Sequence, residues 1–302
     1  ATHYVSVQSD VTSRVQSTEE VQIALELLEQ TNQHLTRVNR RMRSDLQAAA
    51  KVQQSLLPDR LPRTAGVQFA WRFRPCDELA GDILNIYRLD KEHIGVYLLD
   101  VTGHGTAAAL MAVSVSRFLS PQNHASTLVR EHEHDDDGCA DRIVPPAEVA
   151  DRLNRQFPWD YEKQQFFTLV YGVLNTTTRE FRYVSAGHLD PLHLPAAGGV
   201  KVQKSGGLPI GIGNQPYEDK VILLEPGDRL ILFSDGVTET MNGERNLFGP
   251  KRLRKALEEG RGKKLEEGLD LLFEKLEDWN RGPHFDDDLS LVALYVPEEE
   301  PA

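Results

Sequence analysis

Four aspartates of this chain stand where an apolar, β-prone run of residues meets a turn. One aspartate at a strand end is ordinary, because its side chain hydrogen-bonds to the backbone of turns. Several of them would place short, rigid carboxylates on one rim of a sheet, and such oxygen-only sites select Mg²⁺ or Mn²⁺ over softer ions. The pattern therefore predicts a strand-rich fold with a hard-metal site at a sheet edge. The four residues are Asp82, Asp100, Asp235 and Asp287.

Two prolines, Pro58 and Pro62, end a long helical segment, and the chain beyond them alternates short strand-like runs with turn residues. The expected strands are 67–73, 83–89, 94–99, 167–174, 180–184, 200–203, 221–224, 229–233 and 289–296. The expected helices are 106–119, 147–157, 250–257 and 265–279. Strands joined by short turns favour antiparallel sheets, and helices inserted in pairs favour layers outside them. We expect an α+β fold.

The helical segment carries a narrow apolar repeat. Between Val21 and Leu56, apolar residues recur four and three positions apart, which is a heptad pattern. The skipped inner positions hold Asn32, Asn39 and Gln53. Asparagine at such a position favours a parallel two-stranded coiled coil, so we expect a parallel homodimer through this segment. The alternative is an amphipathic helix packed on its own domain, which needs a wider apolar stripe.

Five short motifs follow one another along the chain. They are Glu78-Leu79-Ala80-Gly81-Asp82, Asp100-Val101-Thr102-Gly103-His104-Gly105, Ser185-Ala186-Gly187-His188, Ser234-Asp235-Gly236-Val237-Thr238-Glu239 and Asp287-Asp288-Leu289-Ser290. In this order they resemble the metal-dependent protein serine/threonine phosphatases (the PPM family), in the bacterial SpoIIE-like branch. The resemblance spans 48–296. It implies an antiparallel β-sandwich flanked by helices, in α/β/β/α layers, after an N-terminal coiled-coil helix.

The resemblance also implies an activity, the hydrolysis of phosphoserine or phosphothreonine in a protein by a metal-activated water. This reaction is among the slowest without a catalyst, and two Mg²⁺ or Mn²⁺ ions about 3.5 to 4 Å apart supply the charge stabilisation that it needs. We expect Asp100 to bridge the ions, with the Val101 carbonyl on the second. Asp235 and Asp287 would complete the first. Asp82 would ligate directly or hold metal-bound waters.

Neighbouring residues receive lesser roles. Asp288 would orient the metal ligands. His104, between two glycines, either packs in its turn or acts as a general acid for the leaving alcohol. Ser185 and His188 would shape a turn near the site. The segment 124–142, rich in histidine and acidic residues, is expected to be a solvated loop rather than a metal site.

Other phosphatase chemistries conflict with the spacing of the sequence. A cysteine-based phosphatase loop requires an arginine six residues after its nucleophile. At that distance Cys76 is followed by Asp82, and Cys139 is followed by a proline. An aspartyl-phosphate mechanism requires a second carboxylate two residues beyond the nucleophile, where Asp100 is followed by a threonine.

The chain departs from the family pattern at two positions. Ala80 stands where a second glycine is usual, and its methyl is tolerable if the residue adopts the required dihedrals. Asn85 stands where this branch often has another aspartate, and that loss would weaken one metal site. Two other classes therefore stay open, a catalytically weak dimeric signalling adaptor and a metal-dependent phosphodiesterase or nuclease.

Composition limits the partners. A formal charge of -12 and a pI near 5.3 argue against nucleic acid or an anionic membrane as the main partner. No apolar run approaches the roughly 18 to 20 residues of a membrane span, and no signal peptide opens the chain. Two cysteines make no disulfide framework, so we expect a cytoplasmic protein. The resemblance implies a phosphorylated protein substrate such as an anti-sigma-factor antagonist.

The first residues differ from the rest. Residues 1–15 look like the closing strand and exit of a PAS-type sensor domain, including the light-sensing (LOV) kind, although an ordinary frayed terminus is the alternative. The rest of such a domain is absent, so we expect a fragment of a longer receptor. The expected organisation is a sensor remnant over 1–15, a coiled-coil linker helix over 16–57 and a phosphatase domain over 58–302, regulated by the sensor through the linker.

Overall fold

The computed structural model describes residues 12–64, 66–121, 128–135, 138–160, 165–282 and 284–298. The chain divides into two compact units, Ala1–Ala48 and Ala49–Ala302. Residues 1–11 of the expected sensor remnant lie outside the described residues. Residues 12–15 belong to helix α1 (Thr12–Gln54). Within the described part of the chain, no helix is long and apolar enough to cross a membrane.

Helix α1 confirms the long helix that the heptad pattern predicts. It ends at Gln54, and a turn with hydrogen bonds from the backbone N–H groups of Leu56 and Leu57 closes it before Pro58. Proline cannot continue a helix, because it lacks the N–H donor. In the Ala1–Ala48 unit, Leu46 is half-buried and five other apolar heptad residues are more than half exposed; these are Val21, Leu25, Leu28, Leu35 and Met42.

The Ala49–Ala302 unit contains two five-stranded antiparallel sheets. The first sheet runs in the order β1 (Gln68–Arg74), β12 (Leu289–Tyr295), β11 (Arg229–Phe233), β8 (Leu192–Leu194) and β9 (Lys201–Val202). The second runs in the order β10 (Lys220–Leu223), β7 (Glu180–Ala186), β6 (Phe167–Asn175), β3 (His93–Val101) and β2 (Asp82–Arg88).

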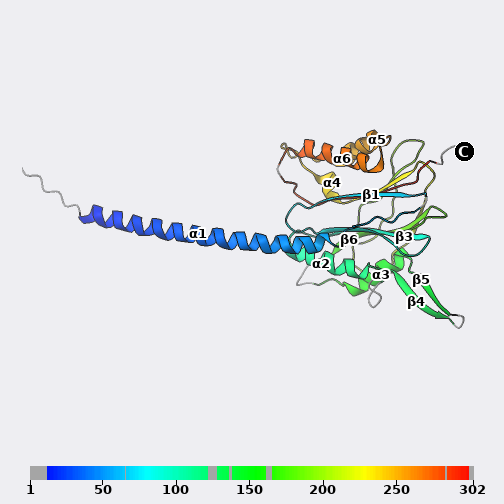
Figure 1. Cartoon of the computed structure of the whole chain (residues 1–302), viewed down its shortest axis with the longest axis horizontal. Coiled ribbons are helices and arrows are strands. Elements are labelled where there is room, and N and C mark those ends of the chain that lie inside the picture. Colours follow the sequence, from blue (N-terminus) through cyan, green and yellow to red (C-terminus); the bar gives the residue numbers. More distant parts are fainter. Residues whose placement is uncertain are drawn as a thin grey trace, which may run out of the picture. The chain divides into compact units, whose positions relative to one another are not determined.

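Helices cover the outer face of each sheet (Figure 1). The second sheet carries α2 (Thr106–Phe118) and α3 (Pro146–Gln156), and a buried cluster with Leu99, Val115 and Leu153 joins them. The first sheet carries α5 (Gly249–Glu259) and α6 (Leu265–Asn280), with the short α4 (Asp235–Glu239) beside them. A third cluster, which includes Leu98 and Val292, fills the space between the sheets. The expected α/β/β/α sandwich is confirmed.

All nine expected strands and all four expected helices occur, with ends shifted by a few residues. Two short elements, β8 with three residues and α4 with five, were not expected from the sequence. The expected loop over 124–142 is wrong for 130–135 and 138–142, while 124–127 and 136–137 lie outside the described residues. There, β4 (Arg130–Asp135) and β5 (Gly138–Ile143) pair as an antiparallel ribbon. A run of charged residues can pair in this way because ladder hydrogen bonds use backbone groups and leave side chains free.

Candidate metal centre

Two of the four aspartates meet through strand pairing. Asp82 opens β2, and the register of the second sheet places it directly opposite Asp100 near the end of β3. The Val101 N–H donates a hydrogen bond to the Gly81 carbonyl, at 3.3 Å, and extends the pairing into the turn. Directly opposite residues in an antiparallel pair have Cβ atoms about 5 Å apart. The pairing therefore brings these two carboxylates to one rim of the sheet.

The other two aspartates come from neighbouring strands of the first sheet. Asp235 follows β11 and begins α4, while Asp287 lies two residues before β12. A Cβ atom added to Gly236 would lie 3.3 Å from the Cβ atom of Asp287. This close approach shows that the two turns touch.

The Val101 carbonyl faces the same rim. A Cβ atom added to Gly81 would lie 3.0 Å from the Val101 oxygen and 3.0 Å from the Gly103 oxygen. Gly81 thus leaves room for these carbonyls beside Asp82. The Val101 carbonyl, which is the expected backbone ligand, therefore lies close to the turn that carries Asp82.

The pKa values of all four carboxylates at the rim are raised by their surroundings. Burial raises the pKa of Asp100 to about 7, with further contributions from the negative charges of Asp235 and Asp287. Burial, with Asp100 as the nearest repulsive charge, raises the pKa of Asp82 well above its usual value. The pKa values of Asp235 and Asp287 are raised as well, chiefly because neighbouring groups partly desolvate their carboxylates, although Asp287 stays exposed to solvent on one side. Carboxylates that repel one another in this way lack a positive charge that would neutralise them.

This donor set fits a hard divalent cation. Among the residues that the structure describes, no lysine or arginine lies within ion-pair distance of the four carboxylates. Carboxylate and carbonyl oxygens are the ligands that Mg²⁺ and Mn²⁺ prefer. A doubly charged ion would supply the missing positive charge.

Asp288 has the supporting role expected of it. Its Oδ1 accepts a hydrogen bond from the Cys76 N–H at 2.8 Å, and its Oδ2 accepts bonds from the Gly81 and Asp82 N–H groups at 2.8 and 3.2 Å. Its own N–H donates to Asp287 Oδ1 at 2.8 Å. One buried carboxylate therefore clamps the turn that carries Asp82 and orients Asp287.

Two serines, which the sequence motifs contain but to which no role was assigned, hold the site together. Ser290 Oγ donates a hydrogen bond to Asp82 Oδ2 at 2.5 Å, which fixes the orientation of that carboxylate. Ser234 Oγ donates to the Asp288 carbonyl and accepts from the Ser290 N–H, each at 3.1 Å. A polar residue inside the apolar run of β12 was the available signal, because a buried hydroxyl needs a partner.

Cys76 also lies at this rim. Its sulfur and the carboxylate oxygens of Asp287 and Asp288 lie within 4.8 Å of one another. Burial, reinforced by Asp288, raises the pKa of the thiol to about 12. A thiol that stays protonated is a poor nucleophile, so the environment of Cys76 agrees with the spacing in excluding a cysteine-based mechanism.

The histidines near the site behave differently from each other. The His104 imidazole is largely exposed at the rim and pairs with Asp77, at 3.2 Å between Nδ1 and Oδ2. His188 accepts or donates a 2.7 Å bond to Thr168 Oγ1, and burial lowers its pKa to about 4. Ser185 Oγ donates to the His188 carbonyl at 2.8 Å, so this pair shapes a turn as expected.

Ala80 and Asn85 are the two residues at which the chain departs from the family pattern. Ala80 has no positive φ, so its methyl costs no backbone strain. The expectation that Asn85 marks a lost metal ligand is wrong. Its Nδ2 donates to the Leu56 carbonyl and its Oδ1 accepts from the Ile86 N–H, both at 2.8 Å. Three residues along β2 from Asp82, its Cα lies about 10 Å from the rim residue.

Gln53 has a different role from the one that its heptad position predicts. Instead of filling an interhelical seam, its side chain is buried against its own domain. Its Nε2 donates to the Ala80 carbonyl at 2.7 Å, and its Oε1 accepts from the Ala80 N–H at 3.1 Å. The end of α1 is thereby tied to the residue that precedes Gly81 and Asp82.

Replacing Gln53 by alanine is expected to lower both stability and activity. The change leaves the buried N–H and C=O groups of Ala80 without partners, which costs about 1–3 kcal/mol. Because Ala80 positions the Asp82 turn, we expect roughly a tenfold loss in turnover. Chemical denaturation and phosphate release would measure the two effects. The neighbouring, exposed Gln54→Ala is the matched control, and an equal effect from it would contradict the proposed contact role.

The two sheets, their outer helices and the carboxylate rim define a class of protein, an α/β/β/α sandwich with a candidate centre for hard divalent ions. Residues 90–297 match the family described as stage II sporulation protein E (SpoIIE). The chain belongs to this family. The expected family is thus confirmed, while the coiled coil and the sensor remnant stay predictions.

Individual relatives agree with this assignment. The phosphoserine phosphatase RsbU of Bacillus subtilis is 28% identical over 297 residues, which cover 96% of this chain and 82% of RsbU. Among solved structures, the SiaA-PP2C domain of Pseudomonas aeruginosa has a TM-score of 0.69 at 20% identity, and the match covers 85% of this chain and 98% of that domain. RsbX in complex with magnesium has a TM-score of 0.53 at 15% identity, covering 78% and 98%. The structural likenesses show the fold.

Proposed function

We propose that this chain is a Mg²⁺- or Mn²⁺-dependent phosphoserine/phosphothreonine protein phosphatase. The observation that carries the proposal is the meeting of four carboxylates from two sheets at one rim, without a positive partner among the described residues. The similarity to a phosphoserine phosphatase, and to a fold that has been solved with magnesium, supports it. When bound, two such ions would activate a water molecule and neutralise the phosphoryl oxygens.

The chain's own residues have distinct tasks in this proposal. Asp100, which the carboxylates of Asp235 and Asp287 repel, would be shared between two ions, and Asp82, Asp235 and Asp287 would supply further carboxylate ligands. The Val101 carbonyl adds a neutral oxygen. Asp288 and Ser290 hold the ligands in place through their hydrogen bonds.

The position of the rim favours a protein substrate. Asp287 and His104 are exposed, so a phosphorylated side chain on the surface of a folded partner can reach them. A small metabolite would need a deep pocket for selection. His104 is available to donate a proton to the leaving serine or threonine oxygen. A phosphorylated anti-sigma-factor antagonist in the cytoplasm is the substrate class that we propose.

Phosphate release tests the proposed activity. We expect the purified chain to release phosphate from a phosphoserine protein when Mn²⁺ or Mg²⁺ is present and to stop when EDTA is added. A generic aryl phosphate should react weakly. Metal-independent release would overturn the metal role. Absence of any release would favour the signalling adaptor, and preference for a phosphodiester would favour the phosphodiesterase.

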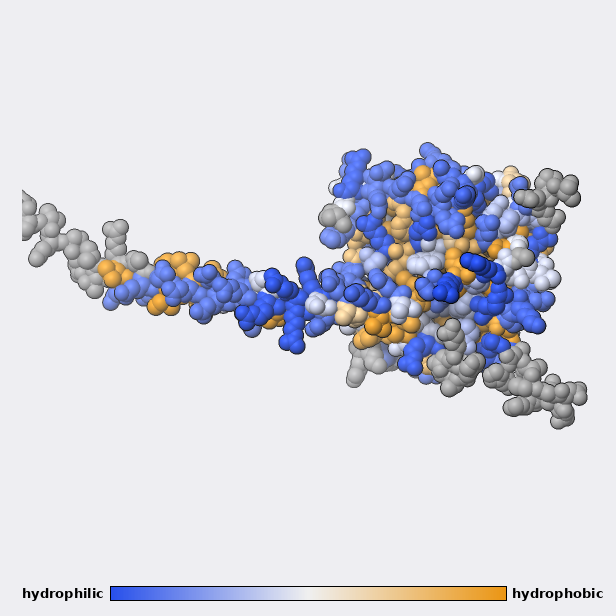
Figure 2. All heavy atoms as spheres, viewed as in Figure 1, coloured by the Kyte–Doolittle hydropathy of each residue, from blue (hydrophilic) through white to orange (hydrophobic). Residues whose placement is uncertain are grey.

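The linker helix suggests how the activity is regulated. Its apolar heptad residues between Val21 and Met42 are exposed on the single chain, and Figure 2 shows apolar atoms along α1. A row of exposed apolar side chains at heptad spacing is typical of a helix that pairs with a second helix. We therefore include in the proposal a parallel homodimer, through which an N-terminal sensor acts on the domain. The contact of Gln53 with Ala80 is a physical link from helix to rim.

Replacing Asn32 and Asn39 together by leucine is expected to strengthen the dimer and alter basal activity. Removing a buried polar pair from the seam increases apolar burial while it loosens the register. We expect the dimer Kd to fall by about tenfold or more, equal to roughly 1.4 kcal/mol. Analytical ultracentrifugation would measure this. The matched control replaces Gln30 and Gln33, which lie outside the seam. A monomer at micromolar concentration, or an equal response to the control, would refute the seam.

A further inference from the structure

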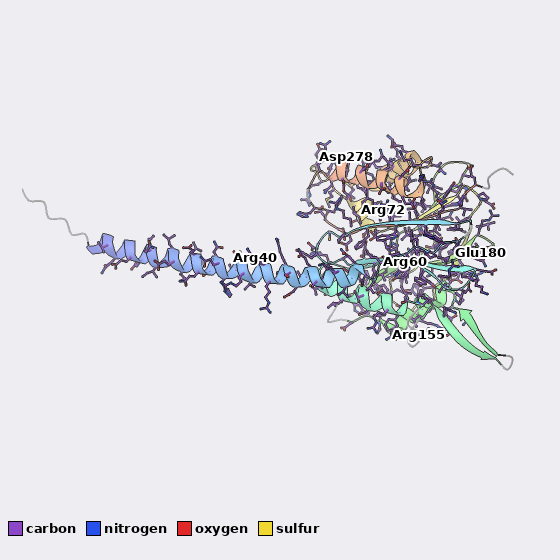
Figure 3. All side chains as sticks on the ribbon, in the orientation of Figure 1. Arg40, Arg60, Arg72, Arg155, Glu180 and Asp278 are labelled. Atoms are coloured by element: carbon purple, nitrogen blue, oxygen red, sulfur yellow. The ribbon has the colours of Figure 1, made fainter. Side chains whose placement is uncertain are left out.

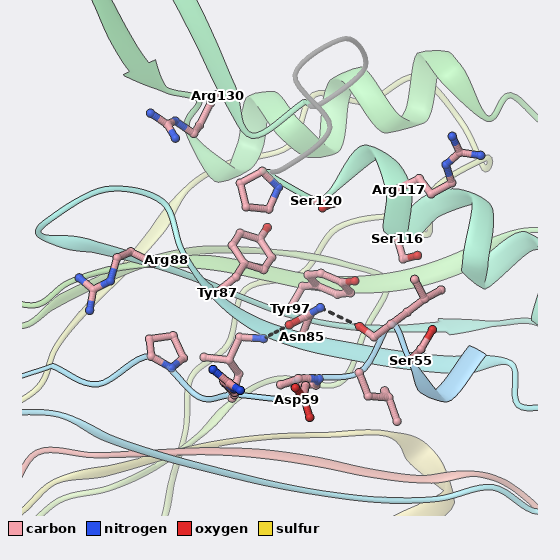
Figure 4. Close-up of a pocket in the computed structure, with 17 residues that line it drawn as sticks. Ser55, Asp59, Asn85, Tyr87, Arg88, Tyr97, Ser116, Arg117, Ser120 and Arg130 are labelled. Carbon is pink, nitrogen blue, oxygen red and sulfur yellow. Dashed lines mark hydrogen bonds between the residues drawn. The ribbon is translucent and has the colours of Figure 1, made fainter. Parts of the chain in front are cut away.

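A second site lies away from the carboxylate rim. A cavity of about 950 Å³ opens between the chain after α1, the strands β2 and β3 and the end of α2 (Figure 4). None of the four rim aspartates lines it. Its floor includes Asn85, whose side chain is fixed to the Leu56 carbonyl at 2.8 Å. A cavity of this size accommodates an organic molecule of several tens of atoms.

The lining of the cavity is cationic in an acidic protein. Four arginines line it, against a single acidic residue, Asp59, whereas the whole chain carries a formal charge of -12. The arginines are Arg60, Arg88, Arg117 and Arg130. Figure 4 shows Arg88 and Arg130 on one flank of the two central tyrosines and Arg117 on the other. Such a concentration of one sign of charge attracts anions.

Three of these arginines lack a carboxylate partner. Arg60, Arg88 and Arg117 form no ion pair with any residue that the structure describes. The Arg88 guanidinium donates to the carbonyls of Arg63 and Lys91, at 2.8 and 3.1 Å, which orients it without neutralising its charge. Guanidinium groups match the geometry of phosphate oxygens and form charge-assisted hydrogen bonds with them.

The cavity also offers aromatic surface and an unused hydroxyl. The rings of Tyr87 and Tyr97 lie 6.1 Å apart between centroids. The Tyr87 hydroxyl is buried beside the Tyr171 hydroxyl, and neither has a hydrogen bond of good geometry among the described residues. Figure 4 shows the Tyr87 hydroxyl on the side of the cavity where Ser120 lies. A buried polar atom without a partner is costly, so a ligand that bonds to it recovers that cost.

We infer that this cavity binds a nucleotide-sized organic phosphate. The arginines would bind the phosphate groups. The two tyrosines, with the apolar side chains of Leu56 and Ile86, would contact the organic part. The occupant would contact both the chain that follows α1 and the end of α2, whose other end follows the Asp100 turn.

Calorimetry on the full chain tests the assignment, with ATP, GTP, pyrophosphate and adenosine as probes. EDTA is present throughout, so that phosphate cannot bind through metal ions at the rim. We expect ATP or GTP to bind with a Kd below roughly 100 µM. Pyrophosphate and adenosine should each bind at least about tenfold more weakly, because each lacks one of the two recognised parts.

Variants locate the binding. The changes Arg60→Glu and Arg117→Glu, each made singly, alter an exposed side chain and should each weaken nucleotide binding by about fivefold or more. Tyr87→Phe should weaken it while the free protein melts no lower. Arg155→Glu, on α3 and outside the lining, is the matched control for net charge (Figure 3). Asp235→Asn should bind normally.

Several results would overturn the inference. These are the absence of ATP and GTP binding, an equal loss in Arg155→Glu, a loss in Asp235→Asn, and equal affinity for pyrophosphate or for adenosine. A loss in Asp235→Asn would place the ligand at the rim. Melting curves of each variant confirm that the compared proteins are folded.

Discussion

Asp100→Asn is expected to abolish metal-dependent phosphate release while the fold persists. The change removes the charge that lies between the carboxylates of the two sheets, and an amide is a weak ligand for a hard divalent ion. We expect a loss of at least about a thousandfold, equal to roughly 4 kcal/mol of transition-state stabilisation. Asp235→Ala should behave alike. The measurement is phosphate release from a phosphoserine protein at saturating Mn²⁺.

Asp286→Asn is the matched control, because Asp286 is exposed and adjacent to Asp287 without belonging to the repulsive cluster. Its turnover should match the unmodified chain. Retained activity in Asp100→Asn would contradict the bridging role, whereas an unfolded Asp100→Asn protein would contradict the claim that the carboxylates repel one another in the free protein.

The same repulsion predicts how stability depends on pH in EDTA. The pKa of Asp100 is about 7 in the folded chain, against an ordinary value of 3.8 for an aspartate in an unfolded chain. Between these values the folded state binds a proton that the unfolded state releases, so the free energy of unfolding falls as pH rises. The fall should level off above about pH 7. In Asp100→Asn it should be smaller, and the melting temperature at pH 8 should be higher than that of the unmodified chain. An unchanged pH profile would contradict this.

Gly236→Ala is expected to destabilise the protein strongly. A Cβ atom at Gly236 would lie 2.2 Å from the Asp288 carbonyl oxygen, and this backbone cannot move without shifting the turn that carries Asp287. Overpacking against rigid neighbours costs about 1–3 kcal/mol or more. We expect a loss near the upper end, together with the loss of metal-dependent activity. Denaturant unfolding monitored by tryptophan fluorescence would measure the first effect.

Gly243→Ala provides the matched control. A Cβ atom there would meet nothing within 4 Å, and Gly243 has no positive φ. Its stability should stay within about 0.5 kcal/mol of the unmodified chain. If both substitutions were equally mild, the close contact of the Asp235 and Asp287 turns would be wrong.

The sequence by itself determined the order of nine strands and four helices and the four aspartates of the carboxylate rim. The spacing of apolar residues within a short segment shows which face of a strand or helix is buried. This holds for the strand 94–99 and for the helix 265–279. Asp82, Asp100, Asp235 and Asp287 were recognisable because each follows or precedes such a segment. Their pairing into one site needed no knowledge of distances, since the rim of a sandwich gathers strand ends.

Tertiary structure alone decided which groups the polar side chains at the rim bond to. Asp288 bonds to Gly81 across 207 positions of the sequence, and Ser290 bonds to Asp82 across 208. No local pattern encodes contacts that arise from the packing of two sheets. In the sequence, Gln53 stands at an inner position of the heptad. In the structure, its side chain hydrogen-bonds to Ala80 instead. Asn85 stands at a position where related sequences often have an aspartate, but the geometry of its strand places it away from the rim. Hydrogen-bond partners depend on which surfaces the fold brings together, and that is settled when the whole domain packs.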